Sequence, residues 1–295
     1  MSKTKKIKSQ KIKTPFGAKI MGAFLFLYAV AILYPYLLAF NSAFREWGAF
    51  TDNIFGVSKL ILDNFKQVFV EFNYPITMPD GTPGAFFFDG LLLNSVLYSV
   101  GCAAASALCP CIVGYCTAKF PYKFSNFIIS MIYVLMALPI VGTTVSEIQM
   151  AQNIGVYNTI PGMWFLKFGF CGLYTLLFHA MFKSVPNEYV EAAYMDGASN
   201  MSIFTRIMLP LSMSTMSVVF ILAFVNFWSD YTTPMYFLPS YPTLALSLLN
   251  FSELSGTTET MQMAACVLLC IPTLVLFACF TEKFTENLQI GGIKG

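Results

Sequence analysis

Charged residues are scarce in this chain of 295 residues, since Asp, Glu, Lys and Arg together make up 11% of it. A soluble domain is usually about one quarter charged. Hydrophobic residues make up 57% of the chain, and its mean hydropathy is +0.66. So few charges cannot cover the surface of a soluble globule of this size. The composition therefore predicts a membrane protein whose helices cross the hydrocarbon core.

The sequence also lacks the groups that most catalytic and metal sites need. It has one histidine, His179, which excludes a conventional metal site and a Ser-His-Asp triad. No G-x-x-x-x-G-K-[ST] motif occurs, which excludes ATP binding by that route. Of the eight cysteines, Cys109 and Cys111 are two residues apart, which is not a zinc spacing. We expect a non-catalytic chain without a cofactor or metal of its own, in which the cysteines are apolar packing residues.

Long apolar stretches are abundant. A helix needs about 20 apolar residues to cross a hydrocarbon core of about 30 Å. We expect an all-α membrane protein with six transmembrane helices, four of them containing a proline that neighbouring groups can accommodate. The expected spans are Phe16–Phe40, Phe88–Thr117, Phe124–Ser146, Thr159–Phe182, Leu211–Tyr231 and Met261–Phe280.

The distribution of basic residues predicts the orientation. Seven lysines precede or open the first span, and no acidic residue occurs before Glu46. With both termini cytoplasmic, most of the 17 Lys and Arg residues fall on the cytoplasmic side, as the positive-inside rule requires. We expect a basic cytoplasmic tail at 1–15, a six-span domain at 16–283 and a cytoplasmic tail at 284–295. The outer segment 41–87 is rich in turn formers and shows no sign of a soluble domain.

The segment 184–210, between the fourth and fifth spans, has the local signals of a helical hairpin. Pro186 suits a first helical turn, and Glu188 and Glu191 place negative charge near a helix start, where it is favoured. Asp196-Gly197 is a natural break, because glycine reaches positive φ without strain.

After that break, Ser202 can cap a second turn holding Phe204, Ile207 and Met208. Pro210 fits the first turn of the fifth span. The small residues before the break allow another surface to approach closely. An ordinary helical loop between two spans accounts for the same residues, so the residue types alone leave both interpretations open.

This loop resembles the EAA motif in the membrane subunits of binding-protein-dependent ABC importers. The family pattern is Glu-Ala-Ala, three residues, Gly, nine residues, Ile, one residue and Leu-Pro. The chain matches it at every defined position: Glu191, Ala192, Ala193, Gly197, Ile207, Leu209 and Pro210. The run Asp196-Gly197-Ala198 is similar to the carbohydrate-uptake, MalG-like members, as is the C-terminal run 287–295.

The resemblance implies an ABC importer type I permease fold and a set of partners. These are a homologous second permease subunit, two ATPase subunits that carry the ATP and Mg, an extracellular solute-binding protein and a carbohydrate cargo, without nucleic acid. It also implies a coupling helix at about Pro186 to Ala198. The implied ATPase contacts are Glu191, Ala192, Ala193, Asp196, Gly197 and Ala198 in the loop, and Gln289, Gly291, Gly292 and Lys294 in the tail.

Charged and aromatic residues near the outer ends of spans are candidates for the substrate pathway, because intramembrane charges are costly and often functional. The residues in question are Asn226, Trp228, Asp230, Tyr231 and Glu147, and Lys167 carries a further charge in the fourth span. Placement at the membrane interface explains the same residues. Another small solute, such as a glycerol phosphate or a polyamine, is an alternative cargo. A gradient-driven transporter without an ATPase is a further alternative.

Overall fold

A computed structural model describes residues 16–56, 59–77, 82–120, 122–138, 142–253 and 256–290, with backbone alone for residue 16 and residues 280–290. The described chain is helical apart from one two-stranded hairpin. In chain order, its elements are α1 Phe16–Ala43, α2 Trp47–Asp52, α3 Asp63–Glu71, β1 Asn73–Thr77, β2 Pro83–Phe87, α4 Phe88–Lys119, α5 Lys123–Ala137, α6 Thr144–Asn153, α7 Ile160–Leu166, α8 Leu173–Ser184, α9 Glu188–Met195, α10 Asn200–Ile203, the π-helical turn η1 Phe204–Met208, α11 Leu209–Trp228, α12 Thr232–Phe237, α13 Leu244–Glu253 and α14 Glu259–Ile290.

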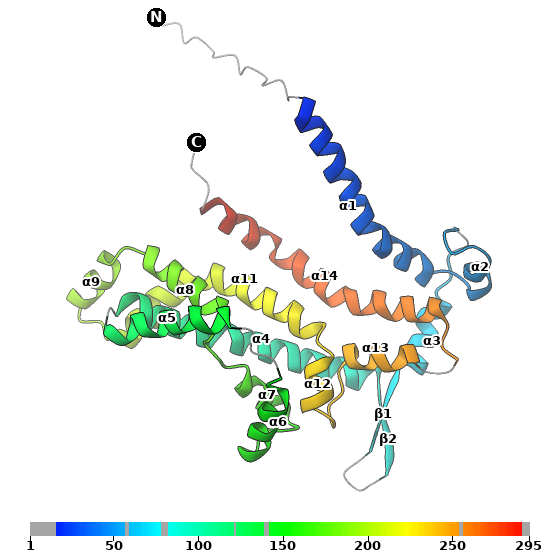
Figure 1. Ribbon diagram of the computed structural model, residues 1–295. Helices are drawn as coiled ribbons and strands as arrows, with labels where there is room; N and C mark the ends of the chain where they lie inside the picture. The colour runs from blue at the N-terminus through cyan, green and yellow to red at the C-terminus, as the bar shows by residue number, and fades with distance from the viewer. Residues whose placement is uncertain are drawn as a thin grey trace, which may run out of the picture.

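Helix α4 is the central helix of the bundle and packs against α11, α8 and α7 (Figure 1). Its approach to α8 is close, because a Cβ at Gly114 would lie 2.6 Å from the Cβ of Phe178 and 2.9 Å from the backbone nitrogen of His179. Helix α1 diverges from the bundle and meets α14 near the end that carries α2 (Figure 1). Helix α9 lies at the opposite end of the molecule from α2 and α3.

Within the described residues, four helices are long and apolar enough to cross a membrane: Gly17–Ala43, Phe88–Lys119, Asn200–Trp228 and Glu259–Cys279. They correspond to the first, second, fifth and sixth expected spans. The last helix runs on to Ile290, beyond the expected end of its span.

The third and fourth expected spans are not continuous helices, which corrects the prediction. Helix α5 stops at Ala137, and Leu138 is extended, the conformation favoured for a residue that precedes a proline. The expected fourth span is divided into α7 and α8, with residues 167–172 between them. At 1.5 Å per residue, the 7 residues of α7 and the 12 residues of α8 span about 10 and 18 Å. Neither reaches the roughly 30 Å of a hydrocarbon core alone.

The outer segment 41–87 folds into α2, α3 and the β1–β2 hairpin, so it has more structure than its turn-rich composition suggested. Arg45 is 1% exposed, and its guanidinium donates to the carbonyl oxygens of Ala49, Asn53 and Ile54. Asn64 donates to the carbonyl oxygens of Ala43 and Arg45 and so ties α3 to the end of α1. Buried polar side chains that bind backbone groups thus hold this segment on the bundle.

Candidate functional site

Helix α9 ends in a left-handed glycine cap. Gly197 has a φ of +79°, its N–H donates to Tyr194, and the N–H of Ala198 donates to Ala193, both over 3.0 Å. This pair of bonds is the Schellman arrangement, which satisfies carbonyls that a helix end otherwise leaves free. The break at Asp196-Gly197 was predicted, and the structure confirms it. The helix itself starts at Glu188, two residues after Pro186.

A lysine at the end of α4 holds the entry to α9. The ammonium of Lys119 donates to the carbonyl oxygen of Val185 over 2.5 Å and to Oδ1 of Asn187 over 2.9 Å. The backbone oxygen of Asn187 in turn accepts from the N–H groups of Val190 and Glu191, in the first turn of α9. The long central helix is therefore bonded directly to the segment that starts α9.

The return from α9 differs in detail from the prediction. Ser199, not Ser202, caps the second helix: its side chain accepts from the N–H of Ser202 over 3.3 Å. Ser202 lies inside α10, so it is one turn too late to be the cap. The π-helical turn η1 follows, and Pro210 lies in the first turn of α11, as predicted.

A buried apolar cluster lies beneath the hairpin. It joins Ala193 of α9, Ile203 of α10 and Met208 of η1 to residues of α4, α8 and α11. Tyr115 of α4 is central to it, with its ring centroid 5.0 Å from that of Phe204 and 5.4 Å from that of Phe182. Displacement of α9 would therefore press on α4, α8 and α11, because a close-packed core transmits strain.

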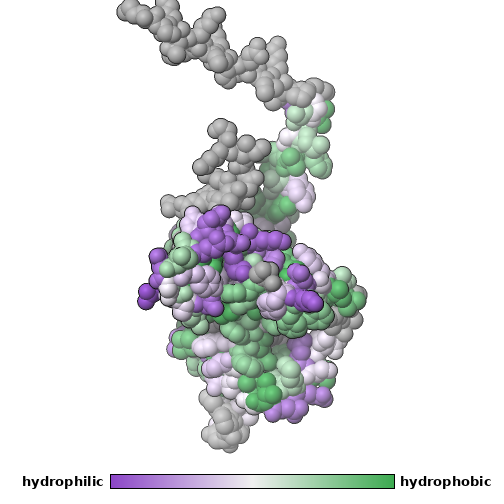
Figure 2. Space-filling view, turned by 90° about the vertical axis from the view of Figure 1, so that its left-hand side faces the viewer, coloured by the Kyte–Doolittle hydropathy of each residue, from purple (hydrophilic) through white to green (hydrophobic). Residues whose placement is uncertain are grey.

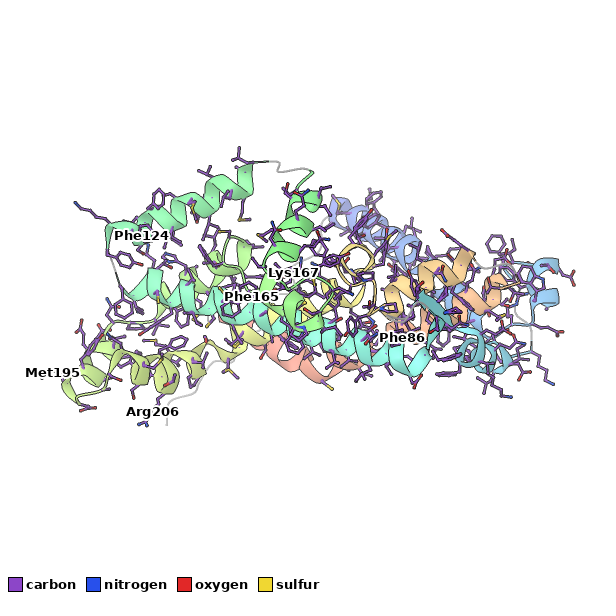
Figure 3. All side chains as sticks on the ribbon, turned by 90° about the horizontal axis from the view of Figure 1, so that it is seen from below. Phe86, Phe124, Phe165, Lys167, Met195 and Arg206 are labelled. Atoms are coloured by element: carbon purple, nitrogen blue, oxygen red, sulfur yellow. The ribbon has the colours of Figure 1, made fainter. Side chains whose placement is uncertain are left out.

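The outward face of α9 is acidic and exposed. Met195 is 89% exposed, and Glu188, Glu191 and Asp196 are exposed beside it. Hydrophilic side chains gather on this end of the molecule (Figure 2), and Met195 and Arg206 mark its tip (Figure 3). A shallow cavity of about 370 Å³ lies on this face, and it is lined by Glu188, Tyr189, Ala192, Ala193, Asp196 and Ile207.

The small residues of the motif divide between two faces. Both line the cavity, but Ala192 is exposed, whereas Ala193 is 7% exposed because it also packs in the cluster beneath α9. Ala193 thus packs within this chain and also reaches the cavity wall, so its place in the expected docking surface stays a prediction. Gly197 is exposed, and a Cβ there would meet open space. Ala198 is half-buried in the same cluster.

The expected tail contacts fall mostly beyond the described chain. Gln289 lies in the last turn of α14, and its side chain is not described. Gly291, Gly292 and Lys294 lie outside the described residues.

The residues expected along the substrate pathway do not form one group. Trp228 is 5% exposed, donates from Nε1 to the carbonyl oxygen of Leu269 over 2.9 Å and stacks on Phe224. It therefore packs against α14, and its expected place in the pathway stays a prediction. Asn226 and Tyr231 are exposed, and Glu147 is exposed on a different helix, α6.

Asp230 follows the end of α11 and turns back into the chain. Its Oδ2 accepts from Tyr98 Oη over 3.0 Å, and its Oδ1 accepts from the N–H of Thr233 over 3.0 Å. Tyr98 is fully buried on α4. Because α11 ends at Trp228, Asp230 is not on its helical surface and does not share a helical face with Asn226.

Lys167, which with Glu147 and Asp230 was a candidate charge for a central polar cavity, lies at the break in the fourth span. Its carbonyl oxygen is 3.5 Å from Ser106 Oγ, near the middle of α4. Its ammonium is 5.9 Å from the centroid of the Phe227 ring. Seen from below, Lys167 lies about midway along the bundle (Figure 3). The signal available in the sequence was the pair of glycines, Gly169 and Gly172, inside an apparently continuous span.

The remaining reactive side chains are one histidine and eight cysteines, of which Cys171, Cys270 and Cys279 are exposed. His179 pairs through Nδ1 with Thr117 Oγ1 over 3.0 Å, which joins α8 to α4. All eight cysteines are free thiols. Across the described part of the chain, no group of three or more His, Cys, Asp and Glu side chains could hold a metal ion.

Comparisons with known proteins all match membrane components of transport systems. The family described as "Binding-protein-dependent transport system inner membrane component" matches residues 111–286. An arabinooligosaccharides transport system permease protein, AraQ of Halalkalibacterium halodurans, is 27% identical over 92% of this chain and 94% of its own. The sn-glycerol-3-phosphate transport system permease protein UgpE of Salmonella typhi is 26% identical over 90% of this chain and 93% of its own.

A solved structure supports the fold. A chain from a bacterial ABC transporter involved in the import of the acidic polysaccharide alginate superposes with a TM-score of 0.75. The match covers 92% of this chain and 99% of that one, at 17% sequence identity. At this identity the likeness concerns the fold.

Proposed function

The chain belongs to the family of binding-protein-dependent transport system inner membrane components, and from this premise we propose that α9 couples an ATPase to transport. It is a permease subunit of an ABC importer in the bacterial cytoplasmic membrane. Such a subunit provides part of the transport pathway and an element that moves with the ATPase, while ATP hydrolysis takes place on a partner subunit. In this proposal, the moving element is the hairpin from α9 to η1, at the cytoplasmic end of the bundle.

The observation that carries the proposal is the way in which the hairpin is fixed. Lys119 bonds the entry to α9, the glycine cap closes its end, and the buried cluster joins it to α4, α8 and α11. The same element presents an exposed acidic face around a shallow cavity with Ala192 on its wall. A hairpin that is rigid on its inner side and open on its outer side is suited to transmit movement from a docked ATPase.

In the proposed complex, a homologous second permease subunit completes the pathway. Two ATPase subunits bind beneath, one of them on α9, and their closure moves the hairpin and switches the pathway between inward- and outward-facing states. An extracellular solute-binding protein delivers cargo at the opposite end, where α2, α3 and the β1–β2 hairpin lie (Figure 1). The C-terminal segment, with Gln289, Gly291, Gly292 and Lys294, reaches the ATPase pair.

The proposed cargo is a sugar or an oligosaccharide, in line with the similarity to AraQ. A glycerol phosphate is the second candidate, because UgpE is nearly as similar. Asn226, Asp230, Tyr231 and Glu147 remain the proposed polar groups of the pathway.

The test of coupling is substitution of Gly197. Valine at a φ of +79° is strained by about 1–2 kcal/mol, although its Cβ meets open space, so the strain falls on the cap itself. We expect Gly197→Val to lower ATP-driven uptake in proteoliposomes by about tenfold, which corresponds to about 1.4 kcal/mol of lost coupling. Gly197→Asn is the matched control, because asparagine tolerates positive φ, and it should retain most uptake.

Two results contradict the proposal. Equal uptake by the valine and asparagine variants would show that the cap does not transmit movement. Failure of any ATPase subunit to copurify with the chain in mild detergent, together with uptake that continues without ATP, would favour a gradient-driven transporter instead.

A further inference from the structure

The break in the fourth span needs a polar surrounding. Residues 167–172 are non-helical between α7 and α8, and Phe168, Gly169 and Cys171 are exposed. A Cβ added at Gly169 would meet open space. Irregular backbone within the hydrocarbon region is tolerated only where protein buries it or where it lines a water-filled cavity. The open side of the break must therefore face a polar pathway or a partner.

The position of the break along α4 places it inside the membrane. Helix α7 packs on the first half of α4, where Trp164 Nε1 donates to the carbonyl oxygen of Leu97 over 3.0 Å. Helix α8 packs on the second half, at Gly114. The break lies between these contacts, beside Ser106. The two short helices follow one another along a single membrane-spanning helix, so the gap between them falls within its length.

Lys167 is the first residue of this break and has no anionic partner within the described chain. Lys167 is half-buried, and its ammonium lies over the ring of Phe227. An ion pair joins Lys66 to Asp63, whereas Lys167 has no carboxylate partner among the described residues. An intramembrane cation of this kind is costly and marks a functional position.

The acidic group next to this region is already engaged. Phe227 meets Tyr98 edge to face at 5.9 Å, and Tyr98 donates to Asp230. The second oxygen of Asp230 accepts from the backbone N–H of Thr233. Each carboxylate oxygen thus has a fixed donor, and the ammonium of Lys167 keeps donors available for a group from outside the chain.

Building on the proposed function, we infer that Lys167 is a cargo-contact residue and that the importer carries an anionic carbohydrate, whose carboxylate or phosphate passes Lys167. A neutral sugar would leave the cation unpaired in the pathway. An anion forms charge-assisted hydrogen bonds with it, which are roughly twice as strong as neutral ones. The half-buried ring of Phe227 supplies the apolar wall beside this contact.

The experiment uses the full complex in proteoliposomes, with its second permease subunit, its ATPase and its binding protein. Uptake is measured for a neutral oligosaccharide, an oligosaccharide that contains a uronate, and glycerol phosphate. We expect import of an anionic cargo by the unmodified complex. Lys167→Met should lower that import at least about tenfold, because a charge-assisted bond contributes about 1.5–3 kcal/mol. Lys167→Arg should retain it.

The control is Lys123→Met, which removes an exposed lysine at the start of α5 and should leave uptake unchanged. Loss of uronate import identifies a carboxylate cargo, and loss of glycerol phosphate import identifies a phosphate cargo. The inference is overturned if the unmodified complex imports only the neutral sugar or none of the three. It is also overturned if Lys167→Met lowers neutral and anionic uptake equally.

Stimulation of the ATPase by the binding protein separates this inference from the proposed function. The Lys167→Met complex should keep that stimulation while it loses anionic uptake. An unmodified complex that shows neither stimulation nor ATP-dependent uptake would instead refute the importer assignment itself.

Discussion

The hairpin around α9 and the break at residues 167–172 are both interruptions in the helical bundle, and they are constructed in opposite ways. The hairpin satisfies its backbone: Gly197 and Ala198 return hydrogen bonds to α9, and Ser199 caps the next helix. The break leaves Phe168, Gly169 and Cys171 exposed and carries a cation without an anionic partner among the described residues. The first region is closed on itself, whereas the second is open to a ligand.

This difference separates transmission of force from contact with cargo. A region that transmits movement must be stiff, and the buried cluster around Tyr115 makes the hairpin so. A region that cargo passes must form and release contacts with it. A cation without a fixed anionic partner, such as Lys167, can do that. Helix α4 connects them, since Lys119 holds the hairpin and Ser106 lies beside the break. In the proposed mechanism, movement of the hairpin reaches the break along this one helix.

The most damaging test of this connection is Gly114→Val. The added Cβ would lie 2.6 Å from Phe178 Cβ and 3.0 Å or less from the α8 backbone, which cannot turn away as a flexible side chain can. Overpacking of this kind costs about 1–3 kcal/mol, occasionally more. We expect a lower melting temperature for the purified complex and loss of ATP-driven uptake.

The control for this variant is Gly22→Val on α1, where a Cβ meets nothing within 4 Å. It should leave melting temperature and uptake close to those of the unmodified complex. A Gly114→Val complex that melts and transports normally would show that α4 and α8 need not stay in close contact, and the proposed route of transmission would then be wrong.

A smaller effect is expected from Lys119→Met. The variant loses the two bonds to Val185 and Asn187 but keeps an unbranched side chain that is only one atom shorter. Hydrogen bonds to charged groups contribute about 1.5–3 kcal/mol, and partial exposure of this lysine places its contribution at the low end. We expect ATPase stimulation by the binding protein to fall several-fold while the complex stays assembled.

Lys123→Met is the matched control, since Lys123 is an exposed lysine at the start of α5, close to Lys119 in sequence. It should leave stimulation unchanged. Equal losses in both variants would mean that general positive charge at this end matters, and that the specific bond to the entry of α9 does not.

The closed region was largely predictable from the sequence. Glycine at 197 and proline at 210 act on their own backbone, so their signals are local, and the structure places them as predicted. Ser199 and Ser202 are both good caps, and tertiary packing decides between them. The burial of Ala193 was not predictable, because an alanine carries no sign of whether its neighbour is this chain or another.

The open region and the outer segment were harder to predict. Hydropathy over residues 159–182 is continuous, and it conceals a break that depends on how α7 and α8 pack on α4. Leu138 before Pro139 gave a local signal for the end of α5, although proline is tolerated within other helices of this chain. The structure of 41–87 depends on Arg45 and on carbonyl groups that come together only in the fold.

The smallest expected effect concerns Trp228. It tests whether this side chain contacts cargo in the pathway or only packs in the bundle. In Trp228→Phe the aromatic bulk stays against Phe224 and α14, while the bond from Nε1 to Leu269 is lost. A neutral hydrogen bond contributes about 0.5–1.5 kcal/mol, so the melting temperature should fall by a few degrees. Uptake should be unchanged, because the side chain is 5% exposed and is not available to cargo.

Tyr231→Phe is the comparison variant for uptake, since the Tyr231 side chain is 46% exposed beside Asp230. Reduced uptake with normal stability in Trp228→Phe would return this tryptophan to the pathway and would remove the distinction between the closed and open regions at the end of α11.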